Sequence, residues 1–221
     1  MDQKLLFLIN REWSSGVLDK FMALASSVAF WAIPLAIGAI FLAWRGGFKG
    51  RTFVVVAVLA FGVTDGLVGR TIKHSIARLR PHQSEFGVRQ VDLQSPAWKG
   101  VFSPIKSKFS IGLSPFKAED GRSFPSNHSA NTAAVAMIAG LLFRRGWLAF
   151  IPALVVSYSR IYTGSHWPSD VAAGIFIGCA VGLSSLALAE WIWRRFGERI
   201  APGAFARHPS LLNRTMKPTA P

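Results

Sequence analysis

Residues 21–44 read FMALASSVAFWAIPLAIGAIFLAW, a stretch without one charged side chain. A second stretch of this kind covers residues 171–189. A membrane-spanning helix needs about 20 mostly apolar residues to cross a hydrocarbon core of roughly 30 Å. The two stretches therefore predict helices that cross a membrane, and they exclude both a water-soluble domain and a disordered chain.

The composition of the whole chain agrees with this prediction. Of its 221 residues, 51% are hydrophobic and 16% are charged, whereas about 25% of the residues in a soluble domain are charged. The net charge is +14. Because the basic excess flanks apolar stretches, it favours anionic lipid headgroups or a phosphorylated substrate as partners over nucleic acid. The length allows one membrane domain, predicted over residues 1–200. The single cysteine, Cys179, excludes an intramolecular disulfide.

The apolar runs predict an all-α, polytopic membrane bundle of about five transmembrane helices. The predicted spans are residues 18–44, residues 52–64 with a polar extension to Arg80, and residues 127–143, 147–162 and 169–193. Residues 3–13 are expected to form an interfacial amphipathic helix, since their apolar core is too short for a secretory signal. Residues 82–124 form a long polar connector, expected to act as a lid or binding loop. Residues 201–221 are predicted to be a disordered tail.

Glycines spaced four apart predict where helices pack closely. Gly174, Gly178 and Gly182 lie on one face of the last span, and small residues let helix backbones approach each other in membranes. Gly62 and Gly66 are expected to do the same on the second span.

The positive charges predict which helix ends face the cytoplasm. Loops 45–51 and 144–146 and the C-terminal segment are rich in Arg and Lys, and short positive loops stay in the cytoplasm. The N-terminus, the connector and the turn at residues 160–168 are then expected to face outward.

Three polar clusters fall at these outward helix ends. They are Lys73 with Arg80-Pro81, then Pro125-Ser126-Asn127-His128, and then Ser159-Arg160 with His166 and Asp170. Ionisable residues at membrane depth are costly and are functional candidates by default. Lys73 and Arg80 are seven residues apart, so on one helix they point two cations at the same place. A solvated basic helix end is the alternative interpretation.

The other two clusters also have a structural and a catalytic interpretation. Ser126 or Asn127 can cap the third span, and the free amides at that helix end can bind an anion. Asp170 can orient the ring of His166, four residues earlier, so that one nitrogen is left as a nucleophile or base. Taken singly, the start of the third span is equally well explained by capping alone, and a pair such as His166 and Asp170 is more often structural than catalytic. Together, three cations, a helix N-terminus, two histidines and a carboxylate provide what phosphoryl transfer requires.

With these spacings the clusters resemble the tripartite signature of the type 2 phosphatidic acid phosphatase (PAP2) superfamily. That signature is Lys, six residues, Arg-Pro; then Pro-Ser-Gly-His; then Ser-Arg, five residues, His, three residues, Asp. The resemblance covers about residues 50–190. It departs at Asn127, where the family most often has Gly. Asn keeps the backbone amide and tolerates unusual backbone geometry, so activity is expected to survive.

The resemblance implies a role for each matching residue. His166 would be the nucleophile that forms a phosphohistidine, Asp170 would orient it, and His128 would be the general acid and then the base. The phosphate would be held by the cations and by the start of the third span: Lys73, Arg80, Arg160, Ser126 and Asn127. No metal or other cofactor is implied, because the cations take its place.

The resemblance also implies a substrate class and a location. The short five-span form resembles small bacterial members that hydrolyse undecaprenyl diphosphate, so a bacterial inner membrane with a periplasmic active site is expected. Phosphatidylglycerophosphate, phosphatidate and lipid A phosphate stay open, because the motifs bind phosphate and not the lipid. A lipid phosphotransferase would carry the same motifs. A non-catalytic lipid-binding or transport protein is the alternative from another class, and the intact set of Lys73, His128, His166 and Asp170 argues against it.

Overall fold

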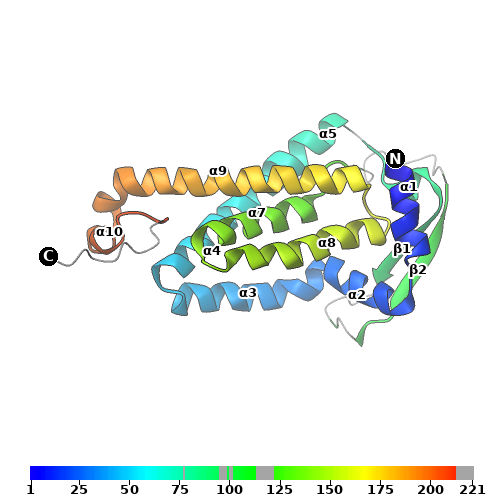
Figure 1. Cartoon of the computed structure of the whole chain (residues 1–221), viewed down its shortest axis with the longest axis horizontal. Coiled ribbons are helices and arrows are strands. Elements are labelled where there is room, and N and C mark those ends of the chain that lie inside the picture. The colour runs from blue at the N-terminus through cyan, green and yellow to red at the C-terminus, as the bar shows by residue number, and fades with distance from the viewer. Residues whose placement is uncertain (77, 95–98, 100–101, 113–121, 213–221) are drawn as a thin grey trace.

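The computed structural model describes residues 1–76, 78–94, 99, 102–112 and 122–212. Within them the chain is an elongated helix bundle with a small sheet at one end (Figure 1). The prediction of a polytopic membrane helix bundle is confirmed. Among the described helices, three are long and apolar enough to cross a membrane. They are α3 (Val28–Arg45), α4 (Gly47–Val63) continued to Gly66, and α9 (Pro168–Ile200).

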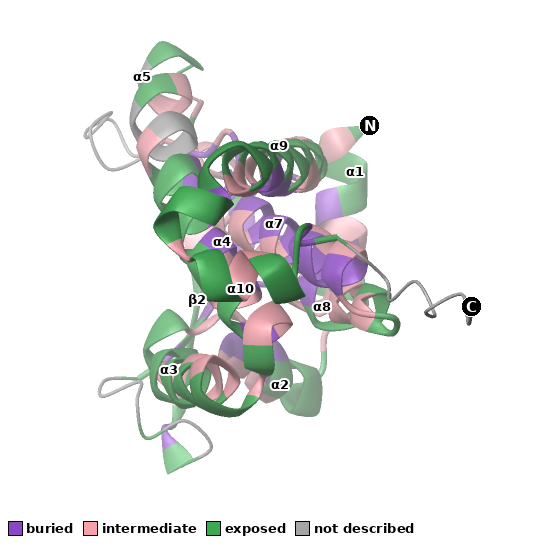
Figure 2. Cartoon of the chain, turned by 90° about the vertical axis from the view of Figure 1, so that its left-hand side faces the viewer, coloured by how far each residue is buried: buried purple, intermediate pink, exposed green. Residues whose placement is uncertain are grey.

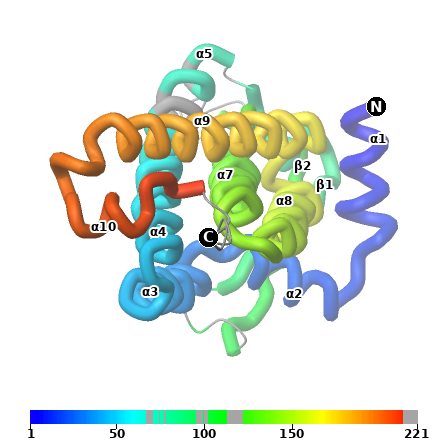
Figure 3. The backbone as a smooth tube through the Cα atoms, turned by 60° about the vertical axis from the view of Figure 1, so that its left-hand side comes forward, coloured from blue at the N-terminus to red at the C-terminus, as the bar shows by residue number. Residues whose placement is uncertain are grey.

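The centre of the bundle is α7 (Asn127–Leu142), which is surrounded by α4, α8 (Phe150–Tyr162) and α9 (Figure 3). A short 3-10 helix, Gly146–Ala149, leads from α7 into α8. Alanines make up most of the buried positions of α7, because small side chains let three neighbours approach it at once. Helix α7, which begins at the polar cluster Pro125-Ser126-Asn127-His128, is therefore the most enclosed helix of the bundle.

The first predicted span is broken in two. Residue Ser27 separates α2 (Gly16–Ser26) from α3, and its side chain accepts a hydrogen bond from the Phe30 amide at 3.3 Å. Serine in an extended conformation is a favoured N-cap, so a new helix begins there. No residue of α3 is buried (Figure 2). This exposure explains why α3 is apolar on all sides, as a helix facing lipid is.

The N-terminal helix and part of the connector cover one end of the bundle (Figure 1). The helix consists of α1 (Asp2–Phe7) and a π-helical turn, η1 (Leu8–Glu12), and runs across the ends of the long helices. The polar extension of α4 is likewise a π-helix, η2 (Thr64–Ile72), followed by α5 (Lys73–Ile76).

The connector begins with α6 (Pro81–Ser84) and contains an antiparallel hairpin of β1 (Phe86–Leu93) and β2 (Ile105–Ile111), with Val91 opposite Ser107. The hairpin was not predicted. The alternation of apolar and polar residues along Ile105–Ile111 is a period-two signal that could have revealed it. Other parts of the connector, residues 95–98, 100–101 and 113–121, lie outside the described residues.

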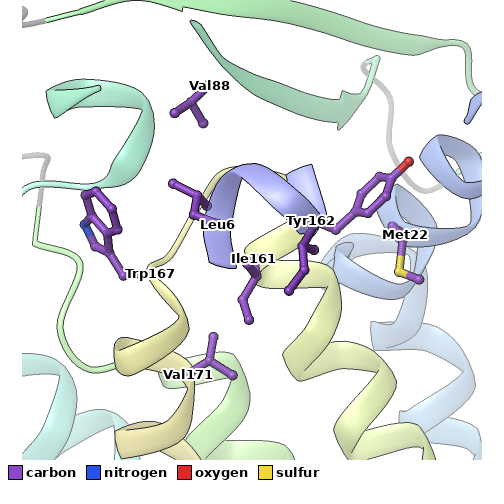
Figure 4. Packing of buried hydrophobic residues seen from close by; sticks show 8 residues of the cluster. Leu6, Met22, Val88, Ile161, Tyr162, Trp167 and Val171 are labelled. Carbon is purple, nitrogen blue, oxygen red and sulfur yellow. The ribbon is translucent and has the colours of Figure 1, made fainter. Parts of the chain in front are cut away.

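An apolar core joins the elements at this end (Figure 4). Its buried members are Leu6, Ile9, Met22, Val88, Ile161, Tyr162, Trp167 and Val171. Burying one large apolar side chain contributes about 1.5–3 kcal/mol. Because these residues come from α1, η1, α2, β1, α8 and α9, they hold the loop between α8 and α9 from several directions. That loop carries His166.

Backbone contact between α7 and α9 aligns the starts of these helices. A Cβ atom added at Gly174 would lie 2.6 Å from the Ser126 carbonyl oxygen, and one at Gly178 would overlap the Ala130 carbonyl. The predicted glycine seam on the last span is confirmed. Gly62 has nothing within 4 Å of its added Cβ, and neither has Gly66, so the corresponding expectation for α4 is wrong.

The chain after α9 folds back on it. Helix α10 (Pro202–Arg207) is followed by Ser210, whose hydroxyl donates to Glu190 Oε1 at 2.7 Å, and by the Leu211 amide, which donates to Glu190 Oε2 at 2.7 Å. A largely buried carboxylate needs such partners. This order differs from the expected disordered tail for residues 201–212; residues 213–221 lie outside the described part.

Candidate active site

The structure brings the three polar clusters together at the end of the bundle that α1 and the hairpin cover. Lys73 begins α5, Arg80 precedes α6, Ser126 caps α7, Arg160 lies in the last turn of α8, His166 lies in the following loop, and Asp170 lies in the first turn of α9. The charges of Arg80 and Arg160 act on both histidines, His128 and His166, and the charge of Lys73 acts on His128. Six elements therefore contribute to one site.

His166 is buried, with 2% of its surface exposed, and its ring nitrogen Nδ1 faces polar side chains. Nδ1 lies 3.7 Å from Asp170 Oδ2 and 3.5 Å from Ser123 Oγ. This contact leaves Nε2 as the free nitrogen. Burial, the largest cause, and the charges of Arg160 and Arg80 lower the pKa of His166 to about 4, although the hydrogen bond and the charge of Asp170 act to raise it. The ring is therefore neutral near neutral pH, which is the form that can act as a nucleophile.

Asp170 is completely buried and held on both carboxylate oxygens. Oδ2 accepts hydrogen bonds from the Trp167 amide at 2.9 Å and from Ser123 Oγ, while Oδ1 accepts from Arg78 Nη1 at 2.7 Å. Sequence reasoning missed Ser123, because nothing in the sequence distinguishes it from the other serines of the connector. The structure also shows an ion pair between Arg78 and Asp170.

Two arginines present hydrogen-bond donors with no partner. In the described part of the chain, Nε of Arg80 and Nε of Arg160 are buried and form no hydrogen bond. Buried donors without a partner cost free energy, which an anion at this position would recover. Burial, together with the charges of the two arginines, lowers the pKa of the Lys73 ammonium to about 8. These three cations are suited to holding a phosphate that carries two negative charges.

The start of α7 is capped by a side chain and is also suited to binding an anion, so both interpretations of this cluster apply. Ser126 is fully buried, and its Oγ accepts from the Ser129 amide at 3.4 Å and from the Ser129 hydroxyl at 3.0 Å. Its side chain therefore caps the helix. The Asn127 side chain donates to Asp65 Oδ1 at 3.3 Å and turns toward η2. The first amides of a helix have no partner within the helix, so those of Asn127 and His128 are suited to an anion.

A cavity of about 300 Å³ opens beside His128 and Arg160. Its other walls are Gln90 and Asp92 of β1 and the break between α2 and α3 at residues 26–29. Sequence analysis did not single out these wall residues, since only the folding of the hairpin over the bundle brings them there. A larger recess of about 610 Å³, lined by residues such as Arg11 and Phe109, contains none of the three polar clusters.

Among the residues that the structure describes, no three His, Cys, Asp or Glu side chains lie together in a way that could hold a metal ion.

Comparison with known proteins points in the same direction as the geometry. A family model described as the PAP2 superfamily matches residues 49–195. The lipid A 4'-phosphatase of Bacteroides thetaiotaomicron is 26% identical over 184 residues, which cover 80% of this chain and 72% of that protein. The undecaprenyl-diphosphatase BcrC of Bacillus subtilis is 27% identical over 191 residues, which cover 85% of this chain and 79% of that protein.

Two solved structures share the fold. The crystal structure of Aquifex aeolicus LpxE superposes with a TM-score of 0.57 at 24% identity, covering 84% of this chain and 94% of that chain. A transmembrane PAP2-type phosphatidylglycerolphosphate phosphatase from Bacillus subtilis gives a TM-score of 0.55 at 20% identity, covering 86% and 87%.

Proposed function

The chain belongs to the PAP2 superfamily and is a phosphatase of lipid phosphates, and on that premise we propose that His166 carries the phosphoryl group as a phosphohistidine. The observation that carries this proposal is the environment of His166. Its Nδ1 faces Asp170 and Ser123, so Nε2 is the nitrogen available for attack. The unpartnered guanidinium nitrogens of Arg80 and Arg160 supply the charge stabilisation that phosphoryl transfer needs.

The reaction then proceeds in two balanced steps. Nε2 of His166 attacks phosphorus, the bond from phosphorus to the lipid oxygen breaks, and His128, which takes up a proton when the phosphate anion binds beside it, gives that proton to the lipid oxygen. His128 next takes a proton from water, the water oxygen attacks phosphorus, and the P–N bond breaks to release phosphate. Asp170 stabilises the positive charge that the His166 ring carries between the steps.

The cavity beside His128 favours a particular leaving group. Because His128 is the proposed acid, the lipid part of the substrate leaves on its side, where Asp92 and Gln90 line the wall. A phosphomonoester of a sugar leaves as a neutral alcohol whose neighbouring hydroxyls can donate to these two side chains. A lipid diphosphate leaves as an anion, which Asp92 repels. Arg160 lines the same cavity, and its charge interacts with that of Asp92, which reduces this repulsion without removing it.

We therefore take a sugar-linked lipid phosphomonoester, of the kind found on lipid A, as the first candidate substrate. The extended match to a lipid A 4'-phosphatase supports it. Undecaprenyl diphosphate is the second candidate. The match to an undecaprenyl-diphosphatase over 85% of this chain supports it, as does the excess of cations around His166.

One panel of substrates in detergent tests both parts of this proposal, the phosphohistidine at His166 and the choice of lipid substrate. Free phosphate would be measured from lipid A, phosphatidate and undecaprenyl diphosphate, with phosphorylated lipid products monitored for transfer. His166→Ala is expected to lose activity on every lipid by several orders of magnitude, because the nucleophile is gone. Acid-labile phosphate should be trapped on the wild type and not on this variant. Near-normal turnover in His166→Ala would exclude the phosphohistidine.

The same panel with Asp92→Asn tests the choice of substrate. Removing this charge is expected to raise the rate on the diphosphate, relative to the rate on the sugar phosphate, on the order of tenfold. Lys99→Gln is a control that changes a connector charge outside the cavity walls. An unchanged ratio for Asp92→Asn would exclude Asp92 as a selector of the leaving group.

A further inference from the structure

One polar network links the N-terminal helix to the buried carboxylate of the active site. Arg78 Nη1 donates to Asp170 Oδ1 and to Ser169 Oγ, each at 2.7 Å, and its Nη2 donates to Asp2 Oδ2 at 2.7 Å. Asp2 accepts hydrogen bonds from the Ser169 amide at 2.9 Å and from the Ser169 hydroxyl at 2.6 Å. The carboxylate of Asp2 in α1 thus accepts hydrogen bonds from the first turn of α9, where the helix dipole favours a negative charge.

We propose that Arg78 is a positioning residue for Asp170, and that Asp2 couples the docking of the N-terminal helix to this positioning. The inference rests on the proposed role of His166. Arg78 bridges two carboxylates of different exposure, since the side chain of Asp170 is 0% exposed and that of Asp2 is 28% exposed. Its planar guanidinium has the fork of donors that such a bridge requires.

The bridge fixes the rotation of the Asp170 carboxylate. Oδ2, the oxygen that faces His166, is also held by Trp167 and Ser123, whereas Arg78 is the partner of Oδ1. Without Arg78, Oδ1 would lose this partner in a buried place, and the carboxylate would be held through Oδ2 alone.

Arg78 is itself held in place by its surroundings. Its guanidinium lies 5.0 Å from the ring centre of Trp167. Its carbonyl oxygen accepts from the Ser123 amide at 2.8 Å. The next residue, Leu79, accepts from the Trp167 indole at 3.0 Å. The segment around Arg78 is therefore interlocked with both segments that hold Asp170.

The charges around His166 and Asp170 give this arrangement an electrostatic signature. Arg78 and Asp2 lie on one side, and the phosphate-side groups are Lys73, Arg80, His128 and Arg160. Removing the Arg78 cation leaves Asp170 less neutralised, so the pKa of His166 should rise. Removing the Asp2 anion leaves Arg78 paired with Asp170 alone, so the pKa of His166 should fall. A general loss of packing would not shift the two variants in opposite directions.

The experiment compares Arg78→Ala and Asp2→Asn in the purified full-length protein in detergent. The titration of His166 is read by NMR of ¹³C-labelled histidine, assigned with His166→Gln, and kcat and KM are measured alongside. We expect opposite shifts of the His166 titration. In Arg78→Ala, kcat should fall about tenfold to a hundredfold with little change in KM, because a hydrogen bond to a buried charge is lost away from the substrate.

Two further variants complete the test. Arg78→Lys keeps the charge but cannot span both carboxylates, so its titration should stay near that of the wild type while kcat recovers in part. Lys4→Ala removes an exposed cation from the same helix outside the network and should change neither quantity. Shifts in the same direction for Arg78→Ala and Asp2→Asn, or a wild-type kcat in Arg78→Ala, would overturn the inference. If Arg78→Ala does not fold, an unshifted titration in Asp2→Asn would overturn it. The titration needs no substrate, so a wild type without phosphatase activity would defeat the proposed function separately.

Discussion

The chemistry of His166 depends on a balance between burial and nearby charge. Burial and two arginines keep the ring neutral, while Asp170 is close enough to stabilise the cation that forms after attack. A carboxylate at 3.7 Å by itself favours a protonated ring, and burial, aided by the charges of Arg160 and Arg80, opposes this. In the proposed reaction the arginines therefore act on both the phosphate and the histidine.

Lys73 should determine the alkaline limit of activity. The pKa of His166 is about 4 and that of Lys73 is about 8. As the pH falls through about 4, His166 gains a proton and can no longer attack. As the pH rises through about 8, Lys73 loses its charge, so phosphate binding weakens and KM should rise.

Lys73→Arg is the matched variant for this prediction, because a guanidinium stays charged across this range. In this variant we expect kcat/KM to fall at a higher alkaline pH than in the wild type, while the decrease at acid pH stays where it is. The pH profiles of both proteins on one lipid phosphate provide the measurement. An identical alkaline limb in the variant would assign that limb to another group.

Among the helices, the contact of α7 with α9 has the most direct consequence for the site. The Ser126 amide donates to the Asp170 carbonyl at 3.1 Å, so the starts of the two helices are joined where the catalytic groups lie. The glycines of α9 make this approach possible. A change in the seam should therefore affect both stability and activity.

Gly178→Ala tests the seam, and Gly62→Ala is its control. A methyl group at Gly178 would overlap the backbone of Ala130, whereas one at Gly62 meets nothing within 4 Å. Overpacking of this kind costs about 1–3 kcal/mol, so Gly178→Ala should lower the midpoint of thermal unfolding in detergent and reduce kcat. Gly62→Ala should leave both unchanged or raise the midpoint slightly, because alanine favours a helix more than glycine does. Equal midpoints for the two variants would mean that α7 and α9 can move apart to admit the methyl group without a loss of stability.

The molecule as a whole has two different ends. The turns at residues 45–47 and 143–146 and helix α10 lie at one end, while α1, the hairpin and the loop with His166 lie at the other (Figure 1). The charge pattern predicted this grouping of loops. We propose that the end with the site faces the periplasm of a bacterial inner membrane, because the opposite end carries the short basic loops.

Cysteine labelling tests this orientation. Ser107→Cys in β2 and Arg145→Cys in the turn after α7 are both at exposed positions, and each would be made in a Cys179→Ser background. In intact cells an impermeant thiol reagent should label position 107 and not position 145. The reverse pattern would place the site in the cytoplasm and remove lipids of the outer leaflet as substrates.

Much of this architecture and chemistry follows from local patterns. The uncharged stretches at residues 21–44 and 171–189 are enough to predict membrane helices, since the thickness of a bilayer is a property of the solvent and not of the fold. The spacings within each polar cluster are also local. They predicted His128, His166 and Asp170, which the structure brings to one end of the bundle.

The other contacts of the site depend on packing between residues that are far apart in the sequence. Asp2 meets Ser169 across 167 positions of sequence, Arg78 meets Asp170 across 92, and Ser123 meets Asp170 across 47. No periodicity or spacing relates such residues, because their proximity depends on the combined packing of α1, the hairpin, α8 and α9 around one apolar core. The same dependence explains why Asp92 lies beside His128: a short strand has a place over the bundle only after the whole core has formed.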